Sequence, residues 1–140
     1  MNRKKHIYEF IKTHALTVIS TVGSDNVPES AVIRFGQTSH LEIIFSTFTN
    51  TRKYKNIMAN PSVSFVIGWD ERITVQYVGI AEELQGKDKL KYKKLFYAQS
   101  SKAIKWDEKK PIAFFKVTPK WIRYSDLNKD PWEIFELKTF

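Results

Sequence analysis

The residues best suited to chemistry lie in one short segment near the middle of the chain. Two hydroxyl residues, Ser46 and Thr47, end an apolar run, and Thr51-Arg52-Lys53 follows after a short turn. Asn50 or Thr51 can cap a helix, and the free N–H groups at a helix start favour an anion. Arginine adds a forked double donor and lysine a point charge. The segment suits a phosphate cradle, although a capped surface helix with two solvated cations carries the same residues.

Other catalytic and metal-binding patterns are absent from the sequence. There is no cysteine, which excludes disulfides and cysteine metal ligands. His6, His14 and His40 lack the i, i+4 spacing that places two ligands on one helix face, so we expect no metal site. No glycine-rich nucleotide loop and no Gly-x-Ser-x-Gly elbow occurs. No residue identifies itself as a general acid or base, and catalytic residues stay unassigned.

Periodicity predicts the elements that position the Ser46–Lys53 segment. Helical spacing predicts helices over residues 2–14, 50 or 51 to about 59, and 87 to about 100. Turn signals lie at 23–26 and 36–40. The predicted strands are Leu16–Val22, Val27–Phe35, Leu41–Thr47, Ser62–Trp69, Ile73–Leu84, Pro111–Tyr124 with an interruption at Pro119, and Trp132–Leu137. We therefore predict an α+β fold, a predominantly antiparallel sheet curled into a barrel with short flanking helices.

Two of these elements carry clear apolar faces. In the predicted strand 73–84, alternate residues from Val75 to Ala81 share one face. In the predicted helix after Thr51, the side chains of Tyr54, Ile57 and Met58 form one apolar stripe.

The length and charge of the chain limit the classes of protein to which it can belong. A chain of 140 residues suits a single domain, 1–140, with its own core. The formal net charge of +8 attracts phosphate of any source, but the lysines of 87–94 have the spacing of a solvated helix face. A nucleic-acid partner is therefore not expected. No run is apolar enough for a signal peptide or a membrane span, and with the lack of cysteine this predicts a cytoplasmic protein.

Five motifs, taken together, resemble the pyridoxamine 5′-phosphate oxidase family. The match runs from about Leu16 to Leu84 and more weakly to Leu137, and the order and spacing of the motifs are more specific than any one of them. The motifs are Val27-Pro28 after a turn, Ile44–Thr47, Thr51–Lys53, Asn60–Phe65 and Val78–Leu84. The resemblance implies a split β-barrel that binds FMN at the interface of a homodimer.

The resemblance also implies roles for individual residues. Ser46 and Thr47 would lie beside the flavin, and Thr51, Arg52 and Lys53 would hold its phosphate. Val32 and Ile33 would line the ring. Thr74 occupies the position of a glutamine near the ring, and Gln76, on the same strand face, is a possible substitute.

The residues that would hold a vitamin phosphate are missing. Ala31 and Gly36 stand where the oxidases carry an arginine and a lysine. The Tyr-x-x-x-Arg-x-x-x-Ser pattern is absent between Lys87 and Ser101, as is a late Arg-x-His-Asp-Arg signature after Trp121. We therefore expect an FMN-dependent oxidoreductase that uses an unidentified small-molecule redox partner and is not a true pyridoxamine 5′-phosphate oxidase. The alternatives are a deazaflavin in place of FMN, a flavin- or haem-binding module without turnover, and a basic nucleic-acid-binding protein.

Overall fold

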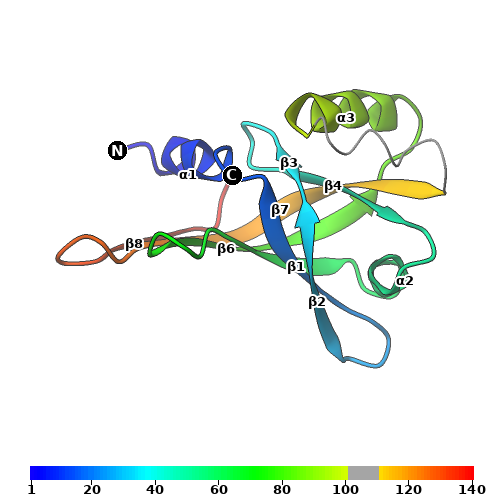
Figure 1. Cartoon of the computed structure of the whole chain (residues 1–140), viewed down its shortest axis with the longest axis horizontal. Helices are drawn as coiled ribbons and strands as arrows, with labels where there is room; N and C mark the ends of the chain where they lie inside the picture. Colours follow the sequence, from blue (N-terminus) through cyan, green and yellow to red (C-terminus); the bar gives the residue numbers. More distant parts are fainter. Residues whose placement is uncertain (101–110) are drawn as a thin grey trace.

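An antiparallel sheet that curls on itself forms the body of the molecule (Figure 1). The computed structural model describes residues 1–100 and 111–140. The helices of this part are α1 (Arg3–Ile11), α2 (Arg52–Ala59) and α3 (Gly86–Gln99). The strands are β1 (Leu16–Val22), β2 (Pro28–Arg34), β3 (Gly36–Gln37), β4 (Ile43–Phe48), β5 (Ser62–Ile67), β6 (Ile73–Glu83), β7 (Ile112–Asp126) and β8 (Glu133–Leu137).

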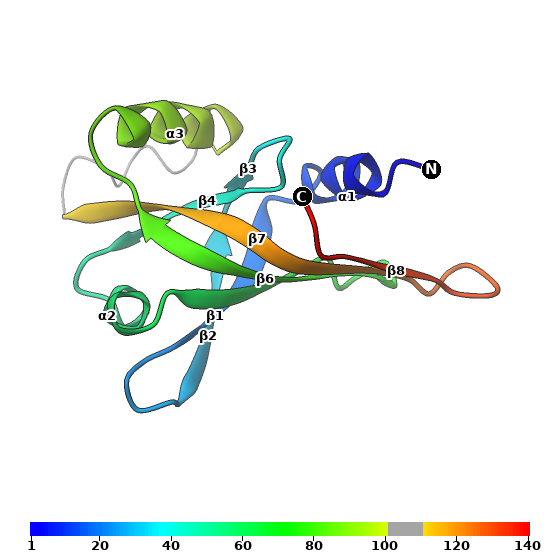
Figure 2. The same ribbon diagram turned by 180° about the vertical axis from the view of Figure 1, so that it is seen from behind.

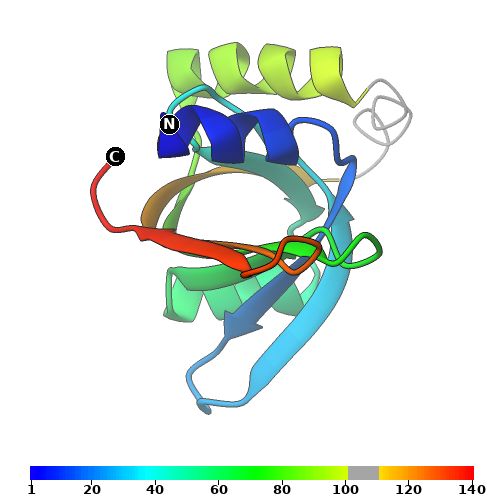
Figure 3. The ribbon, with the colours of Figure 1, turned by 90° about the vertical axis from the view of Figure 1, so that its left-hand side faces the viewer.

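The strand order leaves the barrel open along one side. Neighbours in the described sheet follow the order β2-β1-β5-β6-β7-β4-β3, with β8 added to β7, and every pairing is antiparallel. Viewed along the barrel, the sheet curves around a central core (Figure 3). The first and last strands of the order, β2 and β3, do not pair with each other. The predicted antiparallel split barrel with flanking helices is therefore confirmed.

Alternating side chains fill the inside of the curl. Val75, Tyr77 and Ala81 of β6 point inward and are buried, as their spacing predicts. The Tyr77 hydroxyl donates to the backbone oxygens of Leu41 at 2.7 Å and Val117 at 3.1 Å. This buried phenol therefore ties the middle of the sheet to the segment that leads into β4.

A second, smaller core lies outside the barrel under α3. Ile44 and Phe114 of the sheet pack there with Leu84 and Phe96. Because β4 has a core on each face, its consecutive residues 43, 44 and 45 are all buried. Figure 2 shows α3 above β4 and β7, while α2 lies on the other side of these strands.

Paired glutamine contacts fasten α3 to the sheet. The Gln99 side chain accepts a hydrogen bond from the backbone N–H of Gln37 at 2.9 Å and donates to its backbone oxygen at 3.0 Å. Gly36 makes this approach possible, since a Cβ on it would lie 2.9 Å from Gln99 Oε1. The C-terminal end of α3 is thus held against β3.

The structure corrects three local predictions. The predicted interruption at Pro119 is wrong, because β7 continues through it. Val78 pairs with Trp121 and Gly79 with Pro119, so a bulge at Lys120 accommodates the proline. The predicted turn at 36–40 contains the short strand β3. Met58, which belongs to the predicted apolar stripe of α2, is 51 % exposed, because the adjacent inward positions are taken by Asn56 and Ile57.

Candidate functional site

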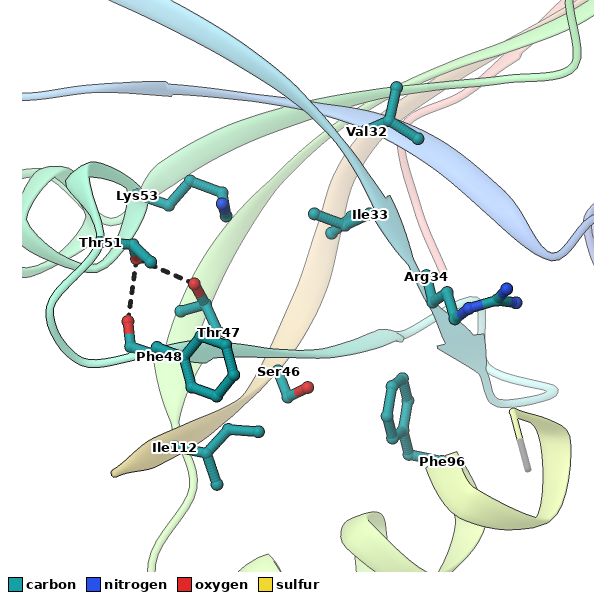
Figure 4. Close-up of a pocket in the computed structure, with 10 residues that line it drawn as sticks. All are labelled: Val32, Ile33, Arg34, Ser46, Thr47, Phe48, Thr51, Lys53, Phe96 and Ile112. Carbon is teal, nitrogen blue, oxygen red and sulfur yellow. Dashed lines mark hydrogen bonds between the residues drawn. The ribbon is translucent and has the colours of Figure 1, made fainter. Parts of the chain in front are cut away.

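A cavity of about 440 Å³ occupies the open side of the barrel. One wall is β2, which pairs only with β1 in the described sheet. The opposite wall is the end of β4, beyond Ile43 and Ile44, which are the β4 residues that pair with β3 in the described sheet. The lining residues are Val32, Ile33, Arg34, Ser46, Thr47, Phe48, Thr51, Lys53, Phe96 and Ile112 (Figure 4). Two strands that are not paired with each other in the described sheet therefore face one cavity.

A network of hydroxyl groups shapes one end of the cavity, where α2 begins. Thr51 is the N-cap, and its Oγ1 accepts from the backbone N–H of Tyr54 at 3.2 Å. The same hydroxyl donates to the Phe48 backbone oxygen at 2.9 Å. Thr47 Oγ1 lies 2.9 Å from it, and Thr47 must be the donor because the single Thr51 proton is already used. The Thr51 hydroxyl is thus fully engaged in holding the start of the helix.

Lys53 provides the positive charge at this end. Its side chain lies on the cavity side of the first turn of α2, close to Thr51 (Figure 4). The first N–H groups of a helix have no partner within the helix, and the helix dipole adds partial positive charge there. An anion at this end of the cavity therefore meets Lys53 and the N-terminus of α2.

Arg52 points into a neighbouring hollow on the other side of α2. Its Nε donates to Glu29 Oε2 at 2.6 Å, and its side chain is 81 % exposed. Asn56 Nδ2 donates to Glu29 Oε1 at 2.9 Å and to Thr21 Oγ1 at 3.0 Å. The hydrogen bonds from Asn56 and Arg52 lower the pKa of Glu29 below its ordinary value. The carboxylate therefore links the start of β2 to α2 and holds one of the donors of Arg52.

Two predicted site residues lie on the outer face of β6. Gln76 lines a separate shallow hollow with Val18, Val66 and Trp121, and Thr74 lies on the same face of the strand. The structure thus brings together Val32, Ile33, Ser46, Thr47, Thr51 and Lys53 in one cavity. It places Arg52, Thr74 and Gln76 outside that cavity.

The sequence pattern missed four residues that line the cavity. Arg34 and Phe48 directly follow predicted site residues on β2 and β4, so their place in the sequence could have indicated them. Phe96 and Ile112 come from distant parts of the chain. Only the packing of α3 and β7 brings them to the cavity, so the local sequence carries no sign of it.

The described residues form neither a metal site nor a membrane-spanning helix. Within residues 1–100 and 111–140, no group of three or more histidine or carboxylate side chains is arranged to hold a metal ion. In the same ranges, none of the helices has the length and apolar character needed to cross a bilayer.

Comparisons with known proteins place the fold. The family model described as pyridoxamine 5′-phosphate oxidase matches residues 4–126. A search among curated protein sequences finds no match. General Stress Protein 26 from Bacillus anthracis is similar at a TM-score of 0.74 and 24% identity, covering 98% of this chain and 100% of that one.

Two of the similar solved structures are described as haem proteins. A heme binding protein from Mycobacterium smegmatis has a TM-score of 0.82 and 11% identity, covering 99% of this chain; the chain spans 59% of that protein's length. The heme storage protein HutZ from Vibrio cholerae has a TM-score of 0.68 and 18% identity, covering 85% of this chain and 91% of that one. At these identities the likeness shows a shared fold alone.

Proposed function

Because the chain belongs to the pyridoxamine 5′-phosphate oxidase family, we propose that it binds FMN and works as a flavin-dependent oxidoreductase on a small molecule. The observation that carries this proposal is the cavity in the split of the barrel. It has the strands β2 and β4 along its length and a cationic helix start at one end. This combination suits a long planar cofactor that ends in a phosphate.

The lining residues fit the parts of FMN. Backbone groups of β2 and β4 suit the polar edge of the flavin ring, and Val32, Ile33 and Ile112 offer apolar contact. Lys53 and the first N–H groups of α2 suit the phosphate. Arg52 still has donors beyond the Nε held by Glu29, and these could reach the phosphate from the adjacent hollow.

The protein's part in the reaction is positioning. When bound, FMN supplies the capacity to accept or donate electrons and hydride. The hydroxyl pair of Thr47 and Thr51 keeps the start of α2 in place, and Lys53 orients the cofactor from that end. The described residues around the cavity include no carboxylate and no imidazole.

The surroundings of position 36 argue against the vitamin phosphate as substrate. Gly36 stands where the oxidases carry a substrate lysine, and a Cβ there would already lie 2.9 Å from Gln99 Oε1 and 3.6 Å from Phe96 Cα. The end of α3 occupies the space next to this position. We therefore propose a different redox partner.

We also propose a homodimer in the cytoplasm. The outer face of β1, β5 and β6 carries the partly exposed side chains of Val18, Val66 and Val78. Thr74 and Gln76 lie on this face, away from the cavity of their own chain. If a second copy packs here, these two residues approach the partner's flavin, as the family resemblance implies. The lack of cysteine fits a reducing compartment.

A haem-binding module is the second candidate, because two of the similar structures are described as haem proteins. Haem iron is usually held by histidine, cysteine, methionine or tyrosine. None of these residue types is among the described residues that line the cavity in the split. This composition favours flavin over haem at that site.

The absorption spectrum of the purified protein, before and after addition of FMN, tests the proposal. We expect flavin bands that stay with the protein through gel filtration, and turnover when a reduced nicotinamide is added. A Soret band without flavin binding would redirect the function to haem. Stable flavin binding without any turnover would favour the non-catalytic module.

A further inference from the structure

The cavity has a second cationic end, opposite the proposed phosphate site. Arg34 is the last residue of β2 and lies beyond Ile33, away from Thr51 and Lys53 (Figure 4). Arg34 takes part in none of the ion pairs found in residues 1–100 and 111–140. Arg52, by contrast, is paired with Glu29 at 2.6 Å. The guanidinium of Arg34 is therefore available to an anion that enters from this end.

Apolar side chains line the cavity next to Arg34. Phe96, which is 1 % exposed, faces this end of the cavity from α3, and Ile112 lies farther along the same side (Figure 4). The position of Phe96 is fixed by the core under α3 and by the glutamine contacts at the end of that helix. A charged fork beside a rigid aromatic wall suits a ligand with an acidic group on a flat body.

We infer that Arg34 anchors the substrate of this cavity, and that the substrate is a small carboxylic acid with a flat apolar body. A guanidinium binds a carboxylate through two parallel hydrogen bonds, which fixes orientation as well as position. The inference rests on the proposed flavin function, since that assigns the Lys53 end to the cofactor. It also relocates the substrate cation, because position 36 is a glycine closed off by α3.

Benzoate is the probe for the experiment, with benzamide as its uncharged analogue and phenyl phosphate as its phosphate analogue. Binding is followed by calorimetry on FMN-loaded protein and by the change in the flavin spectrum. The variants are Arg34→Gln and Arg34→Lys, and Arg72→Gln serves as a matched control at an exposed arginine of the β5–β6 turn.

We expect Arg34→Gln to weaken benzoate binding by about tenfold or more, because one charge-assisted contact is lost. Arg34→Lys should fall between this variant and the wild type, since lysine keeps the charge but not the fork. Benzamide binding, FMN affinity and the Arg72→Gln control should stay unchanged. Unchanged FMN affinity also shows that the variants fold.

Equal benzoate affinity in Arg34→Gln and the wild type would overturn the inference. So would the absence of benzoate binding to the wild type, or benzamide binding as tightly as benzoate. Tighter, Arg34-dependent binding of phenyl phosphate would overturn the carboxylate assignment. The calorimetry is repeated on protein without FMN. Failure of FMN to bind would count against the proposed function. Benzoate binding that does not depend on Arg34 would count against this inference.

Discussion

At the scale of single residues, the three neighbours Thr51, Arg52 and Lys53 play different parts although they form one motif. The hydroxyl of Thr51 is used inside the protein, as the cap of α2 and the partner of Thr47. Arg52 donates a hydrogen bond to Glu29, and Lys53 lines the cavity. The motif therefore combines a structural cap, a partly engaged cation and a cation open to the ligand.

We predict that the double variant Arg52→Ala/Lys53→Ala weakens FMN binding by about 2–4 kcal/mol, because two charge-assisted contacts rarely add fully. Lys53→Ala alone should account for the larger share, since Arg52 keeps its contact with Glu29. Flavin fluorescence titration measures the affinities. Lys55→Ala, an exposed lysine one turn along α2, is the control. An unchanged affinity in the double variant would remove both residues from the phosphate site.

At the scale of elements, α3 connects the stability of the fold to the shape of the site. Its buried residue Phe96 belongs to the outer core and also lines the cavity. The contacts between Gln99 and the backbone of Gln37 hold the end of this helix on β3. A change at the end of α3 should therefore alter the shape of the cavity.

We predict that Gln99→Ala lowers the free energy of unfolding by about 1–2 kcal/mol, because it leaves both backbone groups of the buried Gln37 without this partner. Urea unfolding measures the change. The amide protons of α3 should also exchange faster with solvent, since the end of the helix is released. Gln85→Ala, at the other end of the helix where the side chain makes no cap, is the control. Equal unfolding curves for wild type and Gln99→Ala would show that the outer core alone holds α3.

At the scale of the whole molecule, a second subunit is the arrangement that would make the predicted residue set act together. Thr74 and Gln76 lie on the outer face of β6, whereas the cavity opens between β2 and β4. A second copy of the chain packed on the outer face would bring these two regions together without unfolding the barrel. The outer face is thus expected to be the dimer interface.

Light scattering at micromolar concentration should therefore give twice the mass of the 16.4 kDa chain. We predict that Val78→Asp, which places a charge on this face, shifts the protein toward monomer and weakens FMN binding. Leu90→Asp, at a residue of α3 that is 69% exposed, should leave the mass unchanged. A monomeric wild type with flavin still bound would exclude the dimeric site.

The intact protein should not oxidise pyridoxine or pyridoxamine 5′-phosphate at a useful rate. Anchoring of the substrate phosphate normally contributes to catalysis, and the cation expected at position 36 is replaced by a glycine beneath α3. A steady-state assay with FMN-saturated protein follows formation of pyridoxal 5′-phosphate. Turnover of about 1 per second or faster would contradict this prediction.

The sequence by itself determined the local elements and the family. The strand Leu16–Val22, the inward face of β6 and the capped start of α2 depend on spacing within a few residues, so they can be predicted without the fold. The order of five motifs likewise indicated the family whose model matches residues 4–126. Local signals sufficed for an antiparallel sheet curled into a barrel, because such a sheet is built mainly from alternating strands and tight turns, whereas the split barrel was implied by the resemblance to the family.

Only the tertiary structure decided how those pieces meet. Arg52 turns toward Glu29, 23 residues away, and Gln99 reaches Gln37 across 62 residues. Neither contact follows from local spacing, because each depends on the register of the strands and on where a helix packs against the sheet. The same holds for the cavity, whose walls β2 and β4 are not paired with each other and approach only because the sheet between them curls. Residue types therefore suggested which groups bind a phosphate, while the curl of the sheet determined which of them share one cavity.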